Sequence, residues 1–156
     1  MKVKDIMTSD VKCCSLNTNL AVAAQIMWED DCGALPVTDN QGKVVGVITD
    51  RDICIAAATR SRAEWEIPVQ DVISKTLHAC TPGEEVRAAL ATMKRQKVRR
   101  LPVLGNDGRP VGIVSISDIA LHASTSGKGT EIPAEDVLEA FKSIGAHSTT
   151  HVAVPA

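Results

Sequence analysis

The chain contains an internal repeat. Residues 3–57 align without a gap on residues 69–123, at a constant offset of 66 positions. About 15 of the 55 aligned pairs are identical, against roughly 3–4 expected from average composition. The identical pairs include the tripeptide 35–37, which falls on 101–103, and Asp52, which falls on Asp118. A repeat of this length predicts a duplicated structural unit.

The length of the repeat predicts that the two copies fold together. A unit of about 60 residues buries only about 60% of its unfolded surface and is marginally stable alone. The chain has 156 residues, of which 44% are hydrophobic, so it suits one compact double domain. It has no Tyr, one Phe and two Trp, and its core must therefore be aliphatic.

Composition excludes some partners and favours the cytoplasm. The formal net charge is −2 and the pI is about 6.1, which argues against nucleic acid or an anionic membrane as the main partner. We find no basic, apolar leader, and no apolar run approaches the roughly 18 residues of a membrane span. The five cysteines are odd in number and lack a C-x-x-C spacing, so we expect reduced thiols rather than a disulfide framework.

Each copy shows the same order of local signals, β-α-β-β-α. A short helical turn precedes a brief apolar strand that ends near Cys14 or Cys80, and a helix follows. Two strands joined by a polar turn come next, with Pro110 expected at a strand start or edge, and a last helix ends the copy. In the first copy the paired strands and last helix are expected at 34–38, 43–48 and 50–58; in the second they are expected at 100–104, 109–114 and 116–123.

Local signals also predict where the first helix of each copy begins. In the second copy Thr81, Pro82 and Glu84 have the spacing of an N-cap, a proline at the first helical position and a capping-box glutamate. Ser15 is the equivalent of Thr81 in the first copy. The apolar stripes expected to face the core are Leu20, Ala23, Ala24 and Met27 in one copy and Val86, Ala89, Leu90 and Met93 in the other.

These signals divide the chain into a first repeat at 1–60, a linker at 61–68, a second repeat at 69–124, a connector at 125–132, a helix at 133–145 and a flexible tail at 146–156. The linker is polar apart from Trp65, whose indole we expect to dock on the fold. The final helix carries Val137, Leu138, Phe141 and Ile144 on one face before Gly145 at a C′ position. That face packs either on the double domain or on a partner subunit.

Both copies carry a motif that resembles the CBS domain, named after cystathionine beta-synthase. The pattern is D-I-M-x…L-P-V-x-D-x-x-G-x-x-x-G-x-[IV]-[TS]-x-x-D, and its best-known part is present at 46–52 and again at 112–118. The resemblance covers about residues 1–123 and implies an α+β fold, in which two repeats pack about a pseudo-twofold axis as a CBS pair, or Bateman module. It also implies two clefts that bind AMP, ADP, ATP, NAD or S-adenosylmethionine, and a homodimer of four repeats.

The chemistry of the motif agrees with a nucleotide role. A carboxylate can accept both hydroxyls of a ribose cis-diol, a task that falls to Asp52 and Asp118. The hydroxyls of Thr49 and Ser115, at a strand-to-helix turn, can bond a ribose or phosphate oxygen near helix N-terminal amides. The same [ST]-x-x-[DE] spacing is also a capping box that needs no ligand, and this alternative remains open.

The two copies differ most just before the Leu-Pro-Val tripeptide. In relatives the two preceding residues reach ligand phosphates, and Arg99 and Arg100 hold those positions in the second copy. Arginine binds phosphate bidentately. Gly33 and Ala34 are the equivalents in the first copy, so we expect two unequal clefts, of which the one lined by the arginines prefers the more anionic ligand. The acidic stretch 29–31 of one subunit is also expected to face the basic stretch 94–100 of another.

The full set of candidate ligand-binding residues is Gly33, Ala34, Pro36, Thr49, Asp50, Arg51, Asp52, Arg99, Arg100, Pro102, Ser115, Ser117 and Asp118. We expect no catalytic residue and no metal ligand among them. The expected function is a cytoplasmic regulatory module that senses an adenine nucleotide and acts on a protein in trans, since no catalytic, channel or transporter domain is attached.

Three alternatives stay open at this point. The chain could be a ligand-free dimeric interaction module, for example in a stress response. It could be a metal or redox sensor if pseudo-twofold packing brings Cys13 and Cys14 beside His78 and Cys80, since thiolates and imidazole suit zinc. An enzyme is disfavoured, because the chain lacks G-x-S-x-G, H-E-x-x-H, Walker and G-x-G-x-x-G motifs.

Overall fold

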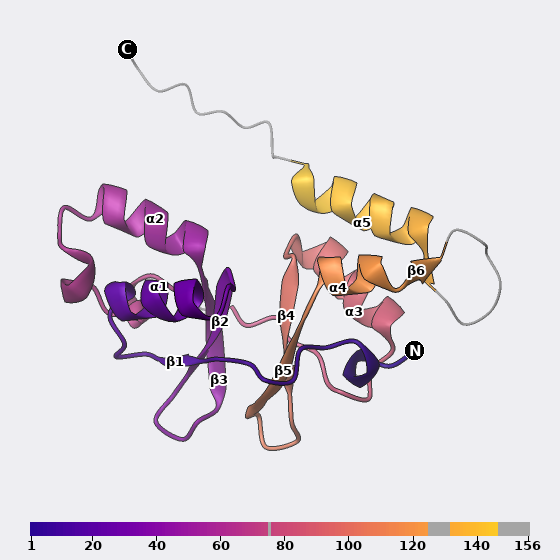
Figure 1. The fold of residues 1–156 in the computed structure, drawn as a ribbon, viewed down its shortest axis with the longest axis horizontal. Helices are drawn as coiled ribbons and strands as arrows, with labels where there is room; N and C mark the ends of the chain where they lie inside the picture. The colour runs from indigo at the N-terminus through magenta and orange to yellow at the C-terminus, as the bar shows by residue number, and fades with distance from the viewer. Residues whose placement is uncertain (75, 125–131, 147–156) are drawn as a thin grey trace, which may run out of the picture.

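The chain folds into two similar α+β units that lie side by side (Figure 1). The structure is a computed structural model and describes residues 1–74, 76–124 and 132–146. The paired strands of the two units lie next to each other in the middle, and the helices cover the outer sides (Figure 1). The predicted α+β class is confirmed, and so is the β-α-β-β-α order of the first copy; in the second copy the first strand is reduced to a single bridge at Cys80.

The elements of the first copy are η1 (Val3–Asp5), β1 (Cys14–Ser15), α1 (Leu20–Glu29), β2 (Ala34–Thr38), β3 (Val44–Thr49) and α2 (Asp50–Thr59). The remaining elements are η2 (Glu64–Glu66), η3 (Val69–Asp71), α3 (Val86–Gln96), β4 (Arg100–Leu104), β5 (Pro110–Ser115), α4 (Ile116–Leu121), β6 (Ala123–Ser124), β7 (Ile132–Pro133) and α5 (Ala134–Gly145). Pro110 lies at the start of a strand, as expected.

The two sheets repeat the same topology. β2 and β3 pair antiparallel, and β1 adds to β2 in parallel, with Cys14 opposite Val37. β4 and β5 pair in the same way, and Cys80 makes the equivalent parallel bridge to Val103. The hairpin turns place Gly42 and Gly108 at φ of 77° and 78°, a region that L side chains rarely adopt, which explains why both copies have glycine there.

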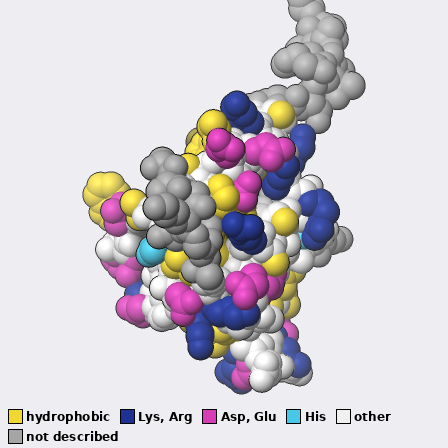
Figure 2. Space-filling model, turned by 90° about the vertical axis from the view of Figure 1, so that its right-hand side faces the viewer, with side chains coloured by type: hydrophobic (Ala, Val, Ile, Leu, Met, Phe, Trp, Pro, Cys, Tyr) yellow, Lys and Arg dark blue, Asp and Glu magenta, His cyan; other side chains and the backbone are white. Residues whose placement is uncertain are grey.

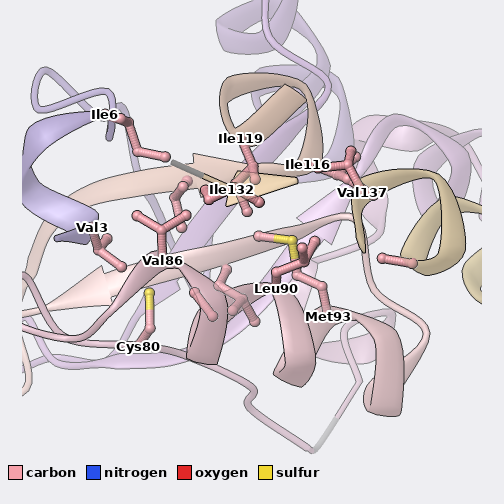
Figure 3. Close-up of a cluster of buried hydrophobic side chains, with 14 of the residues drawn as sticks. Val3, Ile6, Cys80, Val86, Leu90, Met93, Ile116, Ile119, Ile132 and Val137 are labelled. Atoms are coloured by element: carbon pink, nitrogen blue, oxygen red, sulfur yellow. The ribbon is translucent and has the colours of Figure 1, made fainter. Parts of the chain in front are cut away.

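The opening turn of each copy belongs to the core of the other copy. Val3 and Ile6 pack with Val86 and Leu90 in the core of the second repeat (Figure 3). Val69, from η3, packs in the core of the first repeat. The N-terminus accordingly lies beside the second repeat, and the chain then crosses to β1 (Figure 1). Each spatial unit therefore consists of one sequence copy without its own opening turn, together with the opening turn of the other copy. We call this arrangement the exchange of opening turns.

The exchange moves the start of both first helices away from the predicted caps. α3 begins at Val86 and not after Thr81, because the carbonyls of Pro82 and Glu84 accept from the amides of residues 4 and 3 at 3.1 and 2.9 Å. The Thr81–Glu84 pairing survives as a separate turn, in which the Thr81 amide donates to the glutamate Oε2 at 3.3 Å. α1 likewise begins at Leu20, with Asn19 and not Ser15 as its N-cap.

The apolar stripes of the two helices are largely confirmed. Leu20, Ala23 and Met27 are buried along α1, and Ala24 packs against the same core. All four predicted positions of α3 are buried, as Figure 3 shows for Val86, Leu90 and Met93. The amphipathic pattern therefore located the core even where the cap positions were wrong.

Trp65 does not dock: its side chain is 67% exposed in η2, because the buried anchor of this segment is its neighbour Ile67. The expected linker thus holds the chain to the first core through an aliphatic residue.

The last helix packs on its own chain. α5 lies against α3 and α4, with Val137 and Ala140 buried, whereas Leu138 and Phe141 stay about half exposed. Gly145 is the final helical residue and not the one after it. Ile132, expected in the connector, pairs with Ala123 in a short parallel sheet and is buried. The expected connector at 125–131 and the tail at 147–156 lie outside the described residues.

Candidate functional site

A cleft of about 640 Å³ opens between the two repeats. One side comes from the end of β3 and the start of α2, and the facing side comes from the segment after η3 and from the start of β4; the last turn of α5 closes one edge. The residues that line it are Ala34, Val47, Thr49, Asp50, Arg51, Asp52, Ser74, Thr76, Leu77, His78, Gln96, Lys97, Val98, Arg99, Arg100, Phe141, Ile144 and Gly145.

Asp52 is held in this cleft by the helix terminus that carries it. Its Oδ2 accepts from the Thr49 amide at 2.9 Å and from the Thr49 hydroxyl at 2.7 Å, while the Asp52 amide donates to the Thr49 Oγ1 at 3.2 Å. These bonds form a capping box at the N-terminus of α2, so the ligand-free interpretation of the motif is realised. The described structure gives Oδ1 of the same carboxylate no hydrogen bond, so this oxygen can accept one from a ligand hydroxyl.

The second copy repeats this cap in a different place. Ser115 and Asp118 make the corresponding bonds at 2.8, 2.7 and 3.2 Å at the start of α4. Neither residue lines the cleft, and the exposed Ser117 between them does not line it either. The two copies of the motif therefore share their local geometry while only the first contributes to this cleft.

The arginines and the small residues that we assigned to different clefts converge on one. Arg99, Arg100 and Ala34 all line it. Gly33 lies next to Arg100, since a Cβ placed on this glycine would be 3.4 Å from the guanidinium Nη2 and 3.0 Å from the Asp50 Oδ2. The separate assignment was wrong because the sheets of the two repeats lie edge to edge, which brings the starts of β2 and β4 together.

The cleft carries more cations than anions. Four permanent or near-permanent cations line it, Arg51, Lys97, Arg99 and Arg100, against the two carboxylates of residues 50 and 52. Among the described residues none of the three arginines forms an ion pair within 4.0 Å. An excess of unpaired guanidinium groups over carboxylates favours an anionic ligand, which arginine can bind through two parallel hydrogen bonds.

The two prolines of the repeated tripeptide lie elsewhere. Pro36 and Pro102 are buried inside β2 and β4, opposite Val47 and Ile113, and neither lines the cleft. The Pro102 carbonyl accepts from the Cys80 amide at 3.1 Å, in the parallel bridge beside β4.

The cysteines and His78 do not come together as the metal hypothesis required. Cys14 lies in the core of the first repeat and Cys80 in that of the second. Burial raises the pKa of both thiols to about 12, so they stay protonated near neutral pH. His78 lines the cleft, and no group of three or more His, Cys, Asp or Glu side chains suited to a metal occurs in the part of the chain that the structure describes.

Several cleft residues were not predicted from the sequence. Ser74, residues 76–78 and the tip of α5 enter the cleft only because the exchanged turn η3 and the last helix pack where they do. Lys97 and Val98 were detectable, because they directly precede the arginines along the chain. The sequence shows that Phe141 and Ile144 belong to the apolar stripe of the last helix, but it does not show which surface that stripe contacts.

The family follows from the repeat itself. A model of the CBS domain matches residues 3–58 and again 69–124. The chain belongs to the CBS domain family. It is 38% identical to a 17.7 kDa protein of Acidianus ambivalens over 141 aligned residues. The alignment covers 87% of this chain and 82% of that protein. The resemblance noted from the sequence is thereby confirmed as a tandem CBS pair.

Two solved structures share the fold of this CBS pair. One is a CBS domain pair in complex with 5′-methylthioadenosine and S-adenosyl-L-methionine, with a TM-score of 0.71 and 27% identity over 78% of this chain and 94% of that one. The other is Hypoxic Response Protein I with two coordinated zinc ions, with a TM-score of 0.72 and 31% identity over 80% of this chain and all of that one.

No helix within residues 1–74, 76–124 and 132–146 is long and apolar enough to cross a bilayer.

Proposed function

We propose that this CBS pair is a non-catalytic regulatory module that binds an adenine nucleotide, of the AMP, ADP, ATP or NAD type, in the cleft between its repeats. The observation that supports the proposal is that Asp52, Arg99 and Arg100 line one cleft. The carboxylate suits a ribose cis-diol and the guanidinium groups suit phosphate. A related CBS pair solved with two adenosine-type ligands supports the choice of an adenosine compound.

The proposed signal is a shift between arrangements of the two repeats. The cleft is lined by both repeats and by α5, so a ligand that contacts all of them favours the arrangement in which they are close. A partner protein in trans that binds only one arrangement would then respond to ligand concentration. We place this function in the cytoplasm, where adenine nucleotides are abundant.

Calorimetry with AMP, ATP, NAD and S-adenosylmethionine tests the proposal. We expect Asp52→Ala to weaken binding about 10-fold or more, because hydrogen bonds to a charged group contribute about 1.5–3 kcal/mol. Asp118→Ala is the matched control: it removes an equivalent capping box with nearly the same distances, but Asp118 lies outside the cleft. Both variants should lose similar thermal stability, and only the first should lose affinity.

Arg100→Ala separates phosphate binding from nucleoside binding. We expect it to weaken AMP and ATP while leaving adenosine within about twofold, since adenosine has no phosphate for the guanidinium to contact. Equal AMP affinity in wild type and Arg100→Ala would contradict the assignment of this residue. Absence of binding by every ligand would favour the interaction-module alternative, and turnover of a bound nucleotide would favour an enzyme.

We also propose a homodimer, supported by large apolar side chains that the single chain leaves exposed. Trp28 is 87% exposed on α1 and Leu121 is 82% exposed on α4. The proposed pairing of the acidic stretch 29–31 with the basic stretch 94–100 has fewer available cations than the sequence indicated, because Lys94 pairs with Glu139 at 2.6 Å within the chain. Sedimentation at rising salt tests it: a dimer whose dissociation ignores salt contradicts the charge pairing.

A further inference from the structure

The cleft has one phenyl ring on its wall beside the imidazole of His78, and that phenyl ring comes from α5. Phe141 is the only phenylalanine of the chain, which has no tyrosine. Both tryptophans, at 28 and 65, lie outside the cleft. The Phe141 side chain is 53% exposed although it is large and apolar, so its ring faces space that the rest of the described chain does not fill.

The helix fixes the position of this ring. Val137, one turn earlier on the same side of α5, is buried in the core of the second repeat (Figure 3), and Ile144, one turn later, also lines the cleft. Two polar contacts hold the helix in place: Lys94 pairs with Glu139 at 2.6 Å, and Lys97 donates from Nζ to the Ala146 carbonyl at 3.1 Å. A ring on a helix held at its middle and at its C-terminal end is positioned before any ligand arrives.

The cleft also has several apolar lining residues. Val47, Leu77, Val98 and Ile144 line the cleft together with Phe141. The charged lining residues come from two segments: residues 50–52 at the start of α2, and Lys97, Arg99 and Arg100 in the stretch that also supplies Val98. The cleft therefore combines groups suited to a ribose and a phosphate with apolar side chains suited to a base.

We propose that α5 supplies the base-binding wall of the cleft, with the ring of Phe141 stacked on the face of the adenine. This inference rests on the proposed function and assigns the base specificity to a helix that follows the second copy of the repeat. A nucleobase presents a flat π-face, and stacking on an aromatic side chain contributes strongly to its binding. The ring thus favours ligands that carry a base over phosphorylated sugars.

The test is AMP affinity, measured by calorimetry, for Phe141→Ala, Phe141→Tyr and Leu138→Ala. We expect Phe141→Ala to weaken AMP binding about 5-fold or more and Phe141→Tyr to retain it, because the tyrosine keeps the ring. Leu138→Ala is the matched control, since Leu138 lies on the same helix, is 55% exposed and does not line the cleft. It should leave the affinity within twofold of wild type. Thermal melts of all three variants should stay near wild type, because neither side chain is buried.

Each result decides the inference. If the wild type binds AMP and Phe141→Ala binds it equally well, the stacking role is wrong while the proposed function stands. Equal weakening by Leu138→Ala, or failure of Phe141→Tyr to retain affinity, also overturns the stacking role, since either result points to the docking of α5 and not to the ring. If the wild type binds no adenine compound, the proposed function and this inference fall together.

Discussion

At the scale of single residues, the two repeated glycines at the centre of β3 and β5 serve the exchanged segments. A Cβ on Gly112 would lie 2.8 Å from both the Met7 sulfur and the Thr8 carbonyl oxygen. A Cβ on Gly46 would lie 3.0 Å from the Ile73 Cδ1 and 3.3 Å from a backbone oxygen. The atoms that approach these glycines belong to the chain itself.

Gly112→Ala should therefore lower the free energy of unfolding by about 1–3 kcal/mol, the usual cost of overpacking. Gly46→Ala should cost less, because its closest neighbour is the end of a flexible side chain. Gly83→Ala is the control, since nothing lies within 4 Å of its Cβ position. Urea unfolding measures all three; an equal loss at Gly83 and Gly112 would show that the close approach of residues 7–8 is not the cause.

The buried thiols give a prediction about pH. Because burial raises the pKa of Cys14 and Cys80 to about 12 from an ordinary 9.0, the folded chain holds these protons more tightly than the unfolded chain. The free energy of unfolding should consequently fall as the pH rises from about 9 to 12. At pH 8 iodoacetamide should label the exposed Cys54 quickly and these two cysteines only after unfolding, as mapped by mass spectrometry. Fast labelling of Cys80 in the folded chain would contradict the burial.

At the scale of elements, α5 joins the core of the second repeat and the cleft. Ala140 is fully buried where the helix meets the core, and the sequence stripe did not include it. The predicted stripe contained Leu138 and Phe141, which are half exposed. The helix is therefore rotated from the orientation that its largest side chains suggested, because the small Ala140 allows close approach to α3.

Ala140→Leu should destabilise the chain by about 1–3 kcal/mol, since the added carbons have no space at this contact. The same substitution at Ala146, an exposed position just past the helix, should change the free energy of unfolding by less than about 0.5 kcal/mol. Thermal or urea unfolding of the two variants gives the comparison. If Ala140→Leu proves neutral, α5 does not pack on the core at this position.

At the scale of the whole molecule, the exchange of opening turns ties the two repeats into one unit. Val3 and Val69 occupy equivalent positions in the two copies, both are fully buried, and each lies in the core of the other copy. Backbone bonds fix the crossing segments: the Thr8 amide donates to the Ile113 carbonyl at 2.9 Å, and the Val69 amide to the Thr18 carbonyl at 2.8 Å. Neither copy completes its core without the other.

The exchange of opening turns predicts which repeat each substitution destabilises. Val3→Ala and Val69→Ala should each cost about 2 kcal/mol, from lost burial and the cavity left behind. Hydrogen exchange should become faster in α3 and β4 for Val3→Ala, and in α1 and β2 for Val69→Ala. Faster exchange confined to the copy that carries the mutation would contradict the exchange of turns.

The sequence alone determined the duplicated β-α-β-β-α unit, the strand pairs, most of the buried stripe of each helix and the family. These features follow from the spacing of nearby residues and from the identities between residues 66 positions apart. Both can be read from one sequence without an alignment of relatives. It also placed Thr49 and Asp52 at a helix start, since a capping box is a local motif.

Only the tertiary structure decided which residues meet. The sequence paired each opening turn with its own copy and put Gly33 and Ala34 in a different cleft from Arg99 and Arg100. The fold crosses the turns over, brings the four residues together and adds Phe141 from the last helix. The physical reason is that the apolar face of each segment could pack against several other apolar faces of the same chain. Which of these contacts forms depends on the shape and packing of the whole core.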